Sequence, residues 1–401
     1  MLQEDFITKL IDIQDAVIEN VQLDGLHIHI HLSLKRKPHT CPLCGALTQN
    51  VHDYRIQKIK DLPIHGKHVV LHYRKRRYQC ACCSKRFYEK LHILPKRHRI
   101  TSRTALYAID SLRERRSIKD TANALGVSSS SVSRWLKFVR FPVPKALPRV
   151  LSIDEFKGNA SGEKYQCILT DLKQRRIFDV LPTRKQEELF AYFAYFQDKT
   201  SVKYIVMDMN RAYLEVARTY FPSAVVVIDK FHVARYCTWA FENVRKRVQK
   251  KLPAYERKYF KRSRKLLLAR MKSLSDENKL AVERMLSYSA DLTNAYILKE
   301  YFYEFMASKD KLQAKSKLEW FRLQAGVAAL GEFERCLTML RNWEAFILNA
   351  FDCGYSNGFT EGVNNSVKVL KRVGFGYRNF DTLRTRIFLI HQKSAASLTR
   401  A

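Results

Sequence analysis

The chain has 401 residues, enough for two or three domains and at least one sizeable core. Its 72 lysines and arginines outnumber the 39 aspartates and glutamates, and the formal net charge of +33 favours a polyanionic partner. Nucleic acid fits best, because each cation placed near a phosphate releases condensed counterions. A ribosome-like or membrane-surface basic protein would carry a similar charge, so charge alone does not choose among these classes.

The N-terminal segment, residues 1–13, carries acidic residues before any apolar run and lacks the basic start of a signal peptide. No apolar stretch approaches the roughly 20 residues that span a bilayer. We therefore expect a cytoplasmic protein without a membrane partner. Its nine cysteines should be reduced there, so Cys-x-x-Cys spacing points to metal binding rather than disulfides.

The first 35 residues are expected to form a helix and then an alternating strand at 26–32. Two Cys-x-x-Cys pairs follow, Cys41 with Cys44 and Cys80 with Cys83, and together they predict a structural four-thiolate zinc site. Cys82 is a competing thiol with poorer spacing. Three histidines between the pairs are expected to be strand or surface residues: His65, His68 and His72. A basic run beside the second pair offers cations to phosphate: Arg74, Lys75, Arg76 and Arg77.

Residues 117–136 have a helix-turn-helix pattern. Gly126 permits the tight turn, and Ser128 can cap the second helix. Four residues of that helix would face a DNA groove: Ser129, Ser130, Ser133 and Arg134. An ordinary helical hairpin would show a similar pattern, but the zinc module and the charge favour DNA binding. A proline-rich linker at 141–148 then marks a domain boundary.

The larger domain that follows has the pattern of a mixed α/β sheet. Its expected strands and helices, in chain order, are the strands 150–156, 165–170 and 176–181, a helix at 186–196, a strand at 204–207, a helix from 211 and a strand at 224–228. Residues 230–350 are expected to be almost continuous basic helix. A glycine-rich turn and a final helical stretch close the chain.

Two aspartates are placed to share a metal ion. Asp154 lies inside the first strand of this domain, and Asp208 ends the fourth. If these strands are neighbours, their carboxylates converge, and such hard oxygen ligands suit Mg²⁺. Two ions about 3.5–4 Å apart can activate an attacking oxygen and stabilise the leaving one, with Mn²⁺ as a substitute. Completing that pair of sites needs a third carboxylate.

Glu361 is the best candidate for the third carboxylate, because it opens a predicted helix after the glycine-rich turn. Polar and basic residues follow it: Asn364, Asn365, Lys368, Lys371 and Arg372, of which the three cations would contact DNA. A solvated helix face is the alternative, and for Glu361 taken alone it is the better one. Asp229 and His232 are accessory candidates, since Asp229 ends an apolar strand and could either support the metal or cap the next helix.

Taken together, these segments resemble the DDE transposases of bacterial insertion sequences, in particular the ISL-three group, along nearly the whole chain. The resembling segments are the cysteine pairs, 152–156, 206–209, 229–233, 356–364 and 371–380. The resemblance implies an RNase H-like catalytic core, interrupted by a helical insertion, with Asp154, Asp208 and Glu361 as its acidic triad. It also implies a bacterial protein that associates with the nucleoid when it is bound to DNA.

The expected organisation is thus a multidomain α/β protein. Its parts are a zinc-ribbon-like module at 1–95, a helix-turn-helix domain at 96–141, an RNase H-like core at 142–235, a helical insertion at 236–350 and the rest of the core at 351–401. The hypothesis is an enzyme that binds terminal inverted repeats, frees a 3′-hydroxyl by hydrolysis and joins it to target DNA by direct transesterification. Synapsis of two ends would need at least a homodimer.

Three other functions would fit part of the sequence. A catalytically silent, transposase-derived regulator would keep both DNA-binding modules without needing the acidic triad. A nuclease for structured nucleic acid would share the core but not the joining step. A purely structural basic protein would need no paired acids at strand ends.

Overall fold

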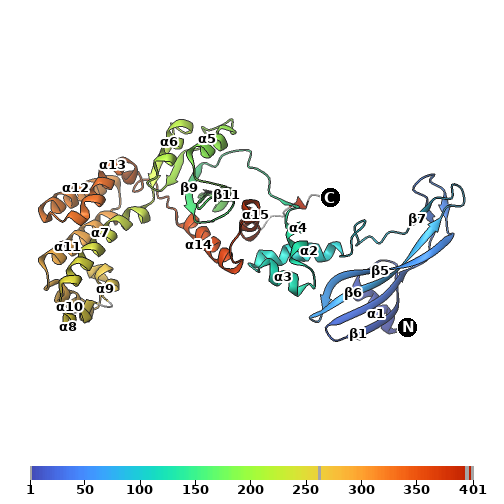
Figure 1. Cartoon of the computed structure of the whole chain (residues 1–401). Coiled ribbons are helices and arrows are strands. Elements are labelled where there is room, and N and C mark those ends of the chain that lie inside the picture. The colour runs from blue at the N-terminus through green and yellow to red at the C-terminus, as the bar shows by residue number, and fades with distance from the viewer. Residues whose placement is uncertain (1, 261–262, 393–396, 399–401) are drawn as a thin grey trace. The chain divides into compact units, whose positions relative to one another are not determined.

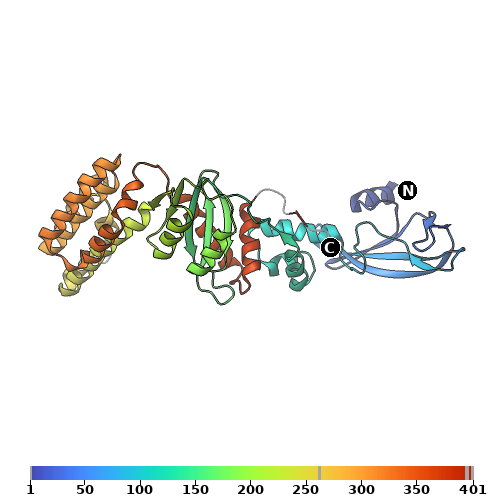
Figure 2. The same cartoon turned by 90° about the horizontal axis from the view of Figure 1, so that it is seen from above.

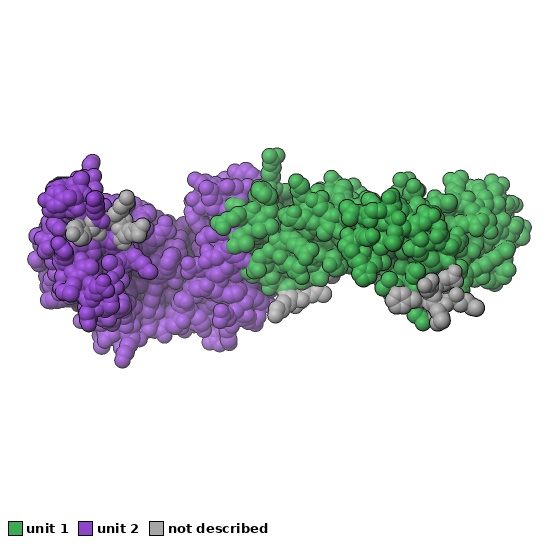
Figure 3. Space-filling model, turned by 90° about the horizontal axis from the view of Figure 1, so that it is seen from below, with its two compact units in different colours: residues 1–142, 369–401 green, residues 143–368 purple. Residues whose placement is uncertain are grey.

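The computed structural model describes residues 2–260, 263–392 and 397–398. The chain forms two compact units (Figure 3): residues 1–142 together with 369–401, and residues 143–368. Across the described ranges, no helix is both long enough and apolar enough to cross a membrane.

The first unit begins with a twisted sheet whose strands run in the order β1-β2-β6-β5, with β7 paired to β6. Its elements are α1 (Leu2–Ile11), β1 (Ala16–Asp24), β2 (His27–Leu34), β5 (Val51–Ile64), β6 (Lys67–Gln79) and β7 (Arg86–Tyr88). Alternate residues of β2 and β6, such as Ile30 and Leu71, are buried on one face. The short pair β3 (His39–Thr40) and β4 (Leu47–Thr48) flanks the first cysteine knuckle.

The helix-turn-helix forms as the sequence predicts. Its helices are α2 (Ser102–Ser111), α3 (Ile118–Ala124) and α4 (Ser129–Leu136), with the short helix η1 (Leu112–Glu114) before α3. Ser128 caps α4 by accepting a hydrogen bond from Ser131 N at 3.2 Å. Val132 and Leu136 are buried against the other two helices.

Helix α15 (Phe380–His391) packs in this first unit, against the helix-turn-helix. The Arg386 side chain is fully buried and donates hydrogen bonds to the carbonyl oxygens of Leu112 (2.8 Å) and Arg116 (2.7 Å). Strand β14 (Ser397–Leu398) pairs with β8 (Val139–Arg140). From the sequence, residues 351–401 are expected to complete the catalytic core. In the structure, the compact unit that contains the helix-turn-helix includes residues 369–401.

The second unit is built on a five-stranded sheet in the order β11-β10-β9-β12-β13. Its elements are β9 (Val150–Phe156), β10 (Gln166–Asp171), β11 (Arg176–Leu181), α5 (Gln186–Ala194), β12 (Tyr204–Met207), α6 (Arg211–Tyr220) and β13 (Val225–Ile228). The first three strands are antiparallel, and β12 and β13 run parallel to β9. This is the mixed α/β sheet that the sequence predicts.

Helices cover both faces of this sheet (Figures 1 and 2). Leu151 and Ile153 of β9 pack in the core with Leu189 of α5 and Val216 of α6. The opposite face of β9 carries Ser152 and Asp154, whose side chains hydrogen-bond to residues of α14 (Gly358–Val373) and the turn before it. Strand alternation therefore puts Asp154 on the α14 face.

The segment between β13 and α14 is helical, as expected. It comprises α7 (Lys230–Lys251), α8 (Ala254–Phe260), α9 (Arg264–Leu268), η2 (Met271–Ser273), α10 (Asp276–Leu286), α11 (Ala290–Met306), α12 (Lys311–Ala328), η3 (Gly331–Phe333) and α13 (Glu334–Asn349). Figure 2 shows these helices as one bundle. Its buried residues, such as Phe302 and Phe321, belong to the same hydrophobic core as Leu151 of the sheet.

Candidate active site

Three aspartates form one row across neighbouring strands. In the register of the sheet, Met207 pairs with Ile153 on one side and with Ile228 on the other. An aspartate directly follows each of these three paired residues in the sequence. These aspartates are Asp154, Asp208 and Asp229. Parallel strands with this register bring their following side chains to one edge. The structure therefore brings together the two strand aspartates of the predicted triad and the accessory candidate Asp229.

Helix α14 is pinned to the sheet beside this row. The Thr360 hydroxyl is buried and lies 3.0 Å from Ser152 Oγ and 2.7 Å from Thr170 Oγ1. Asn357 accepts a 2.6 Å hydrogen bond from Ser152 Oγ. These contacts fix the first turn of α14, and Glu361 is the next residue after Thr360.

Asn364, one turn further along α14, is buried and donates a 3.0 Å hydrogen bond from Nδ2 to Asp154 Oδ2. The other oxygen of Asp154 accepts from the backbone N–H of Glu155 at 2.7 Å. Asn364 therefore holds the carboxylate in one orientation. Its neighbour Asn365 is exposed and accepts a hydrogen bond from Lys368 at 3.0 Å.

The link between Glu361 and Asp229 is electrostatic. Glu361 is exposed, and its charge raises the pKa of Asp229, for which burial is the larger cause. Asp229 stands at the N-cap position of α7 but makes no capping hydrogen bond with its side chain. Its Oδ1 instead accepts from Asn357 N at 3.3 Å, which links the Asp229 carboxylate to the turn before α14.

The carboxylates of the row are held in a site that disfavours their charge. Burial raises the pKa of Asp154 to about 6, and the charges of Glu155 and Asp229 act in the same direction. Burial also raises the pKa of Asp208 to about 7, with further contributions from Glu155 and Asp154. The electrostatic influence of His232 acts in the opposite direction and lowers both pKa values.

These residues fit a divalent cation. Asp208 Oδ1 is buried without a hydrogen-bond partner, as is Asn364 Oδ1. A buried carboxylate oxygen that lacks a hydrogen-bond partner and lies beside two further carboxylates would be stabilised by a bound cation. Within the described ranges, the cysteine cluster is the only group in which three or more ligand atoms lie within 4.8 Å of one another. The carboxylate oxygens of the acidic residues lie further apart than this, so they would have to move closer together to bind one ion.

Glu155 lies on the other face of β9, where Arg184 donates a hydrogen bond to it and Tyr213 OH lies 3.5 Å from its Oε2. Because Glu155 is paired with Arg184, we interpret it as a structural neighbour of the row.

A hollow of about 200 Å³ opens beside Asp208, and apart from Asp208 and His232 its lining was not anticipated from the sequence. His232, Arg235, Tyr236 and Trp239 follow one another at spacings of three, one and three residues on α7, which places them on one face of that helix. Arg335 of α13 lies over the Trp239 ring at 5.5 Å. The helical spacing from His232 was the signal that could have identified this cationic and aromatic surface.

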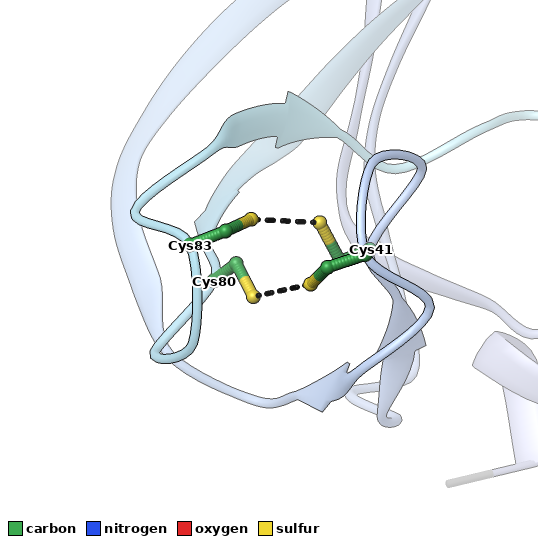
Figure 4. A group of neighbouring side chains, drawn as sticks. Cys41, Cys80 and Cys83 are labelled. Carbon is green, nitrogen blue, oxygen red and sulfur yellow. Dashed lines mark hydrogen bonds between the residues drawn. The ribbon is translucent and has the colours of Figure 1, made fainter.

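The four cysteines of the first unit meet as predicted (Figure 4). The Cys41 and Cys83 sulfurs lie 3.6 Å apart and the Cys44 and Cys80 sulfurs 3.5 Å apart. A tetrahedral zinc ion with bonds of about 2.3 Å separates its sulfurs by about 3.8 Å, so the geometry fits zinc. Cys82 is exposed and lies outside the group.

Backbone amides favour the thiolate form of Cys41 and Cys80, whereas the pKa values of Cys44 and Cys83 are raised by the neighbouring thiols and by burial. The N–H of Cys44, followed by that of Leu43, lowers the pKa of Cys41 to about 6. The N–H of Cys83 likewise lowers the pKa of Cys80. Thiolates are the form that binds zinc.

The predicted DNA-contacting residues differ in their surroundings. Ser129, Ser130 and Arg134 of α4 are exposed, and Ser133 is half-buried. In the basic run, Arg74 is exposed and stacks over Tyr54 at 4.3 Å. Two of its arginines are neutralised within the protein, since Arg76 pairs with Glu89 at 3.2 Å and Arg77 pairs with Asp53. At the end of α14, Lys371 is half-buried and Arg372 is exposed.

A mixed α/β sheet with a row of aspartates is the arrangement expected of one class of enzyme, the polynucleotidyl transferases. Comparison with known proteins gives the family. A family model described as transposase of the ISL3 group matches residues 151–387. The models described as "zinc-finger of transposase IS204/IS1001/IS1096/IS1165" and "Helix-turn-helix domain of transposase family ISL3" match residues 37–83 and 89–139. The chain therefore belongs to the ISL3 family of DDE transposases.

A similar protein is the transposase for insertion sequence element IS1001 of Bordetella parapertussis, 28% identical over 374 residues, which cover 88% of this chain and 89% of the relative. A shorter match of 57 residues, 44% identical, covers 14% of this chain and 18% of a Lactococcus lactis subsp. lactis protein described as an ATP-dependent protease. A match of that length carries no argument about the activity of the whole chain.

Proposed function

We propose that this transposase binds the terminal inverted repeats of an insertion sequence and cleaves and joins DNA strands. Its proposed catalytic residues are Asp154, Asp208 and Glu361. The observation that carries the proposal is the row of aspartates on three neighbouring strand paths, with one buried oxygen of Asp208 left unpaired. A DNA-binding regulator has no need of such a row.

The cation proposed for this site is Mg²⁺, held by Asp154, Asp208 and Glu361, and it would supply Lewis-acid activation of the attacking oxygen and stabilisation of the leaving one. The chain's own residues prepare the site. Asn364 orients the Asp154 carboxylate, and the Thr360 hydrogen bonds fix the turn that carries Glu361.

Binding of the DNA ends is assigned to α4, whose exposed Ser129, Ser130 and Arg134 would contact base edges in the major groove. The structural zinc holds the two cysteine knuckles together and thereby supports this unit. Because two element ends must be brought together, at least a homodimer is proposed in the DNA complex.

The test is cleavage of a labelled element-end duplex with Mg²⁺ by the wild type and by Glu361→Gln. The matched control is Glu319→Gln, which changes an exposed glutamate of α12 in the same unit. We expect Glu361→Gln to retain DNA binding and to lose cleavage, while Glu319→Gln cleaves normally. A pre-cut end with a free 3′-hydroxyl then tests strand transfer.

Two results would contradict the proposal. If the wild type binds the duplex but never cuts it, the regulator function replaces the enzymatic one. If Glu361→Gln cuts as well as the wild type, the third carboxylate is another residue, with Asp229 the next to test.

A further inference from the structure

A groove of about 1260 Å³ lies within the first unit, between the sheet and the helix-turn-helix. Strand β5 supplies much of its wall, residues 97–100 border it, and Ser128 and Ser131 lie at its edge. Six cations line it: Arg55, Lys58, Lys60, Lys75, Arg97 and Arg99. Asp24 is the one acidic residue in the lining.

The charges of this groove are not neutralised by the protein. In the part of the chain that the structure describes, none of the six cations forms an ion pair with a carboxylate. Arg55, Lys58, Arg97 and Arg99 are exposed. Arg76 and Arg77 of the neighbouring strand provide the contrast, because each has an acidic partner. Unpaired cations around one concave surface repel each other and attract a polyanion.

The groove is bounded by a fixed junction between the sheet and the helix-turn-helix. Lys60 Nζ donates a 2.5 Å hydrogen bond to the carbonyl oxygen of Gly126, the turn residue of the helix-turn-helix. Gly126 has a φ of +61°, and a Cβ there would lie 2.7 Å from His68 Nδ1, so no other residue fits without rearrangement. Asp61, next to Lys60, is buried and paired with Arg103 at the start of α2.

The groove also begins where DNA is expected. In helix-turn-helix proteins, the second helix places its N-terminal residues in the major groove. Here that end of α4 is Ser128 to Ser131, which borders the cationic surface. Duplex DNA bound at α4 would therefore have its backbone near these six cations.

We propose that this groove binds the phosphate backbone of the duplex that α4 contacts, so that the sheet and the helix-turn-helix hold one continuous stretch of DNA. The proposal rests on the proposed function in taking duplex DNA as the ligand. The contacts are to phosphates, so they add affinity and fix orientation without adding sequence preference.

The first experiment measures the salt dependence of binding to a labelled element-end duplex, using the full-length, zinc-loaded protein without added Mg²⁺. Lys58→Ala/Arg99→Ala is compared with Lys35→Ala/Lys90→Ala, a control of equal charge change at exposed lysines outside the groove. Each lost phosphate contact lowers the slope of log K against log salt by about 0.9, so we expect a fall of about 2 for the groove variant. An unchanged slope, or an equal fall in the control, overturns the proposal.

The second experiment varies the length of the duplex on the side of the α4 contact. We expect extension of the DNA to increase the affinity of the wild type and of the control, but not of Lys58→Ala/Arg99→Ala. If extension has no effect on the wild type while the wild type cleaves DNA, the groove proposal alone is wrong. If extension acts as expected but no cleavage occurs, the groove proposal stands and the proposed function falls.

Discussion

The Asn364 side chain shows how a single residue can set the geometry of the row. It is buried, and its Nδ2 holds Asp154 Oδ2 at 3.0 Å, whereas its neighbour Asn365 faces solvent. Groups that orient a metal ligand contribute about 10–100-fold to metal affinity or activity. We therefore expect Asn364→Ala to reduce Mg²⁺-dependent cleavage by about that factor and Asn365→Ala to change it little. Equal losses in the two variants would show that Asn364 has no orienting role.

The raised pKa of Asp208 predicts a pH dependence of stability. Burial raises this pKa from an ordinary 3.8 to about 7, so between these pH values the folded state holds a proton that the unfolded state has lost. Stability without a divalent cation should thus fall as pH rises from about 4 to about 7. Asp208→Asn cannot ionise and should keep more of its stability at pH 8, while matching the wild type near pH 4.

Thermal unfolding from pH 4 to pH 8, in zinc-loaded protein without Mg²⁺, measures this difference. About 1 kcal/mol corresponds to roughly 2–4 °C in a domain of this size, so a shift of at least that amount is expected at pH 8. If the unfolding temperatures of the wild type and the variant changed with pH in the same way, the pKa of Asp208 would not be raised in the folded protein.

At the scale of the element, the zinc knuckles separate two thiols that are adjacent in sequence. Cys83 belongs to the four-sulfur group, whereas Cys82 is exposed outside it. We expect Cys83→Ser to lose the zinc and with it the fold of the knuckles, and Cys82→Ser to retain one zinc per chain. Zinc released to a chromophoric chelator measures both. Retention of zinc by Cys83→Ser together with its loss from Cys82→Ser would reverse the assignment.

The elements of the catalytic sheet were predictable because apolar runs mark them. The strands 150–156, 176–181 and 204–207 have the predicted bounds, since both faces of the sheet are covered and most of the residues in each strand are apolar and buried. The long hairpin of β5 and β6 was not predicted. Its solvent-facing charges, such as Lys58 and Arg74, interrupt the apolar pattern that marks a strand.

Contacts between distant parts of the sequence leave no local pattern from which they could be predicted. The strand positions of Asp154 and Asp208 suggested that they are neighbours, and the sheet register agrees. The hydrogen bond from Asn364 to Asp154 joins residues 210 positions apart, and no local pattern indicates it. The same holds for Arg386, whose burial against η1 places α15 with the helix-turn-helix.

For the whole molecule, the hydrophobic cores fall within separate units. The large core joins residues between Leu147 and Phe351, whereas the cores of the first unit join residues 11–91, and 109–139 with Leu389. Each unit therefore has its own apolar interior and can unfold in its own transition. Each also has its own metal site, zinc in the first unit and the proposed Mg²⁺ in the second.

This separation predicts two transitions that respond to different metals. Three of the four tryptophans, Trp239, Trp320 and Trp343, lie in the second unit, so fluorescence reports mainly its unfolding, while zinc release reports the first. A cation at 100 times its Kd adds about 2.7 kcal/mol, or roughly 5–10 °C in a domain of this size. Mg²⁺ should therefore raise the fluorescence transition without moving zinc release, and Asp208→Asn should abolish that rise. A single transition that both metals shift together would mean that the two units unfold as one.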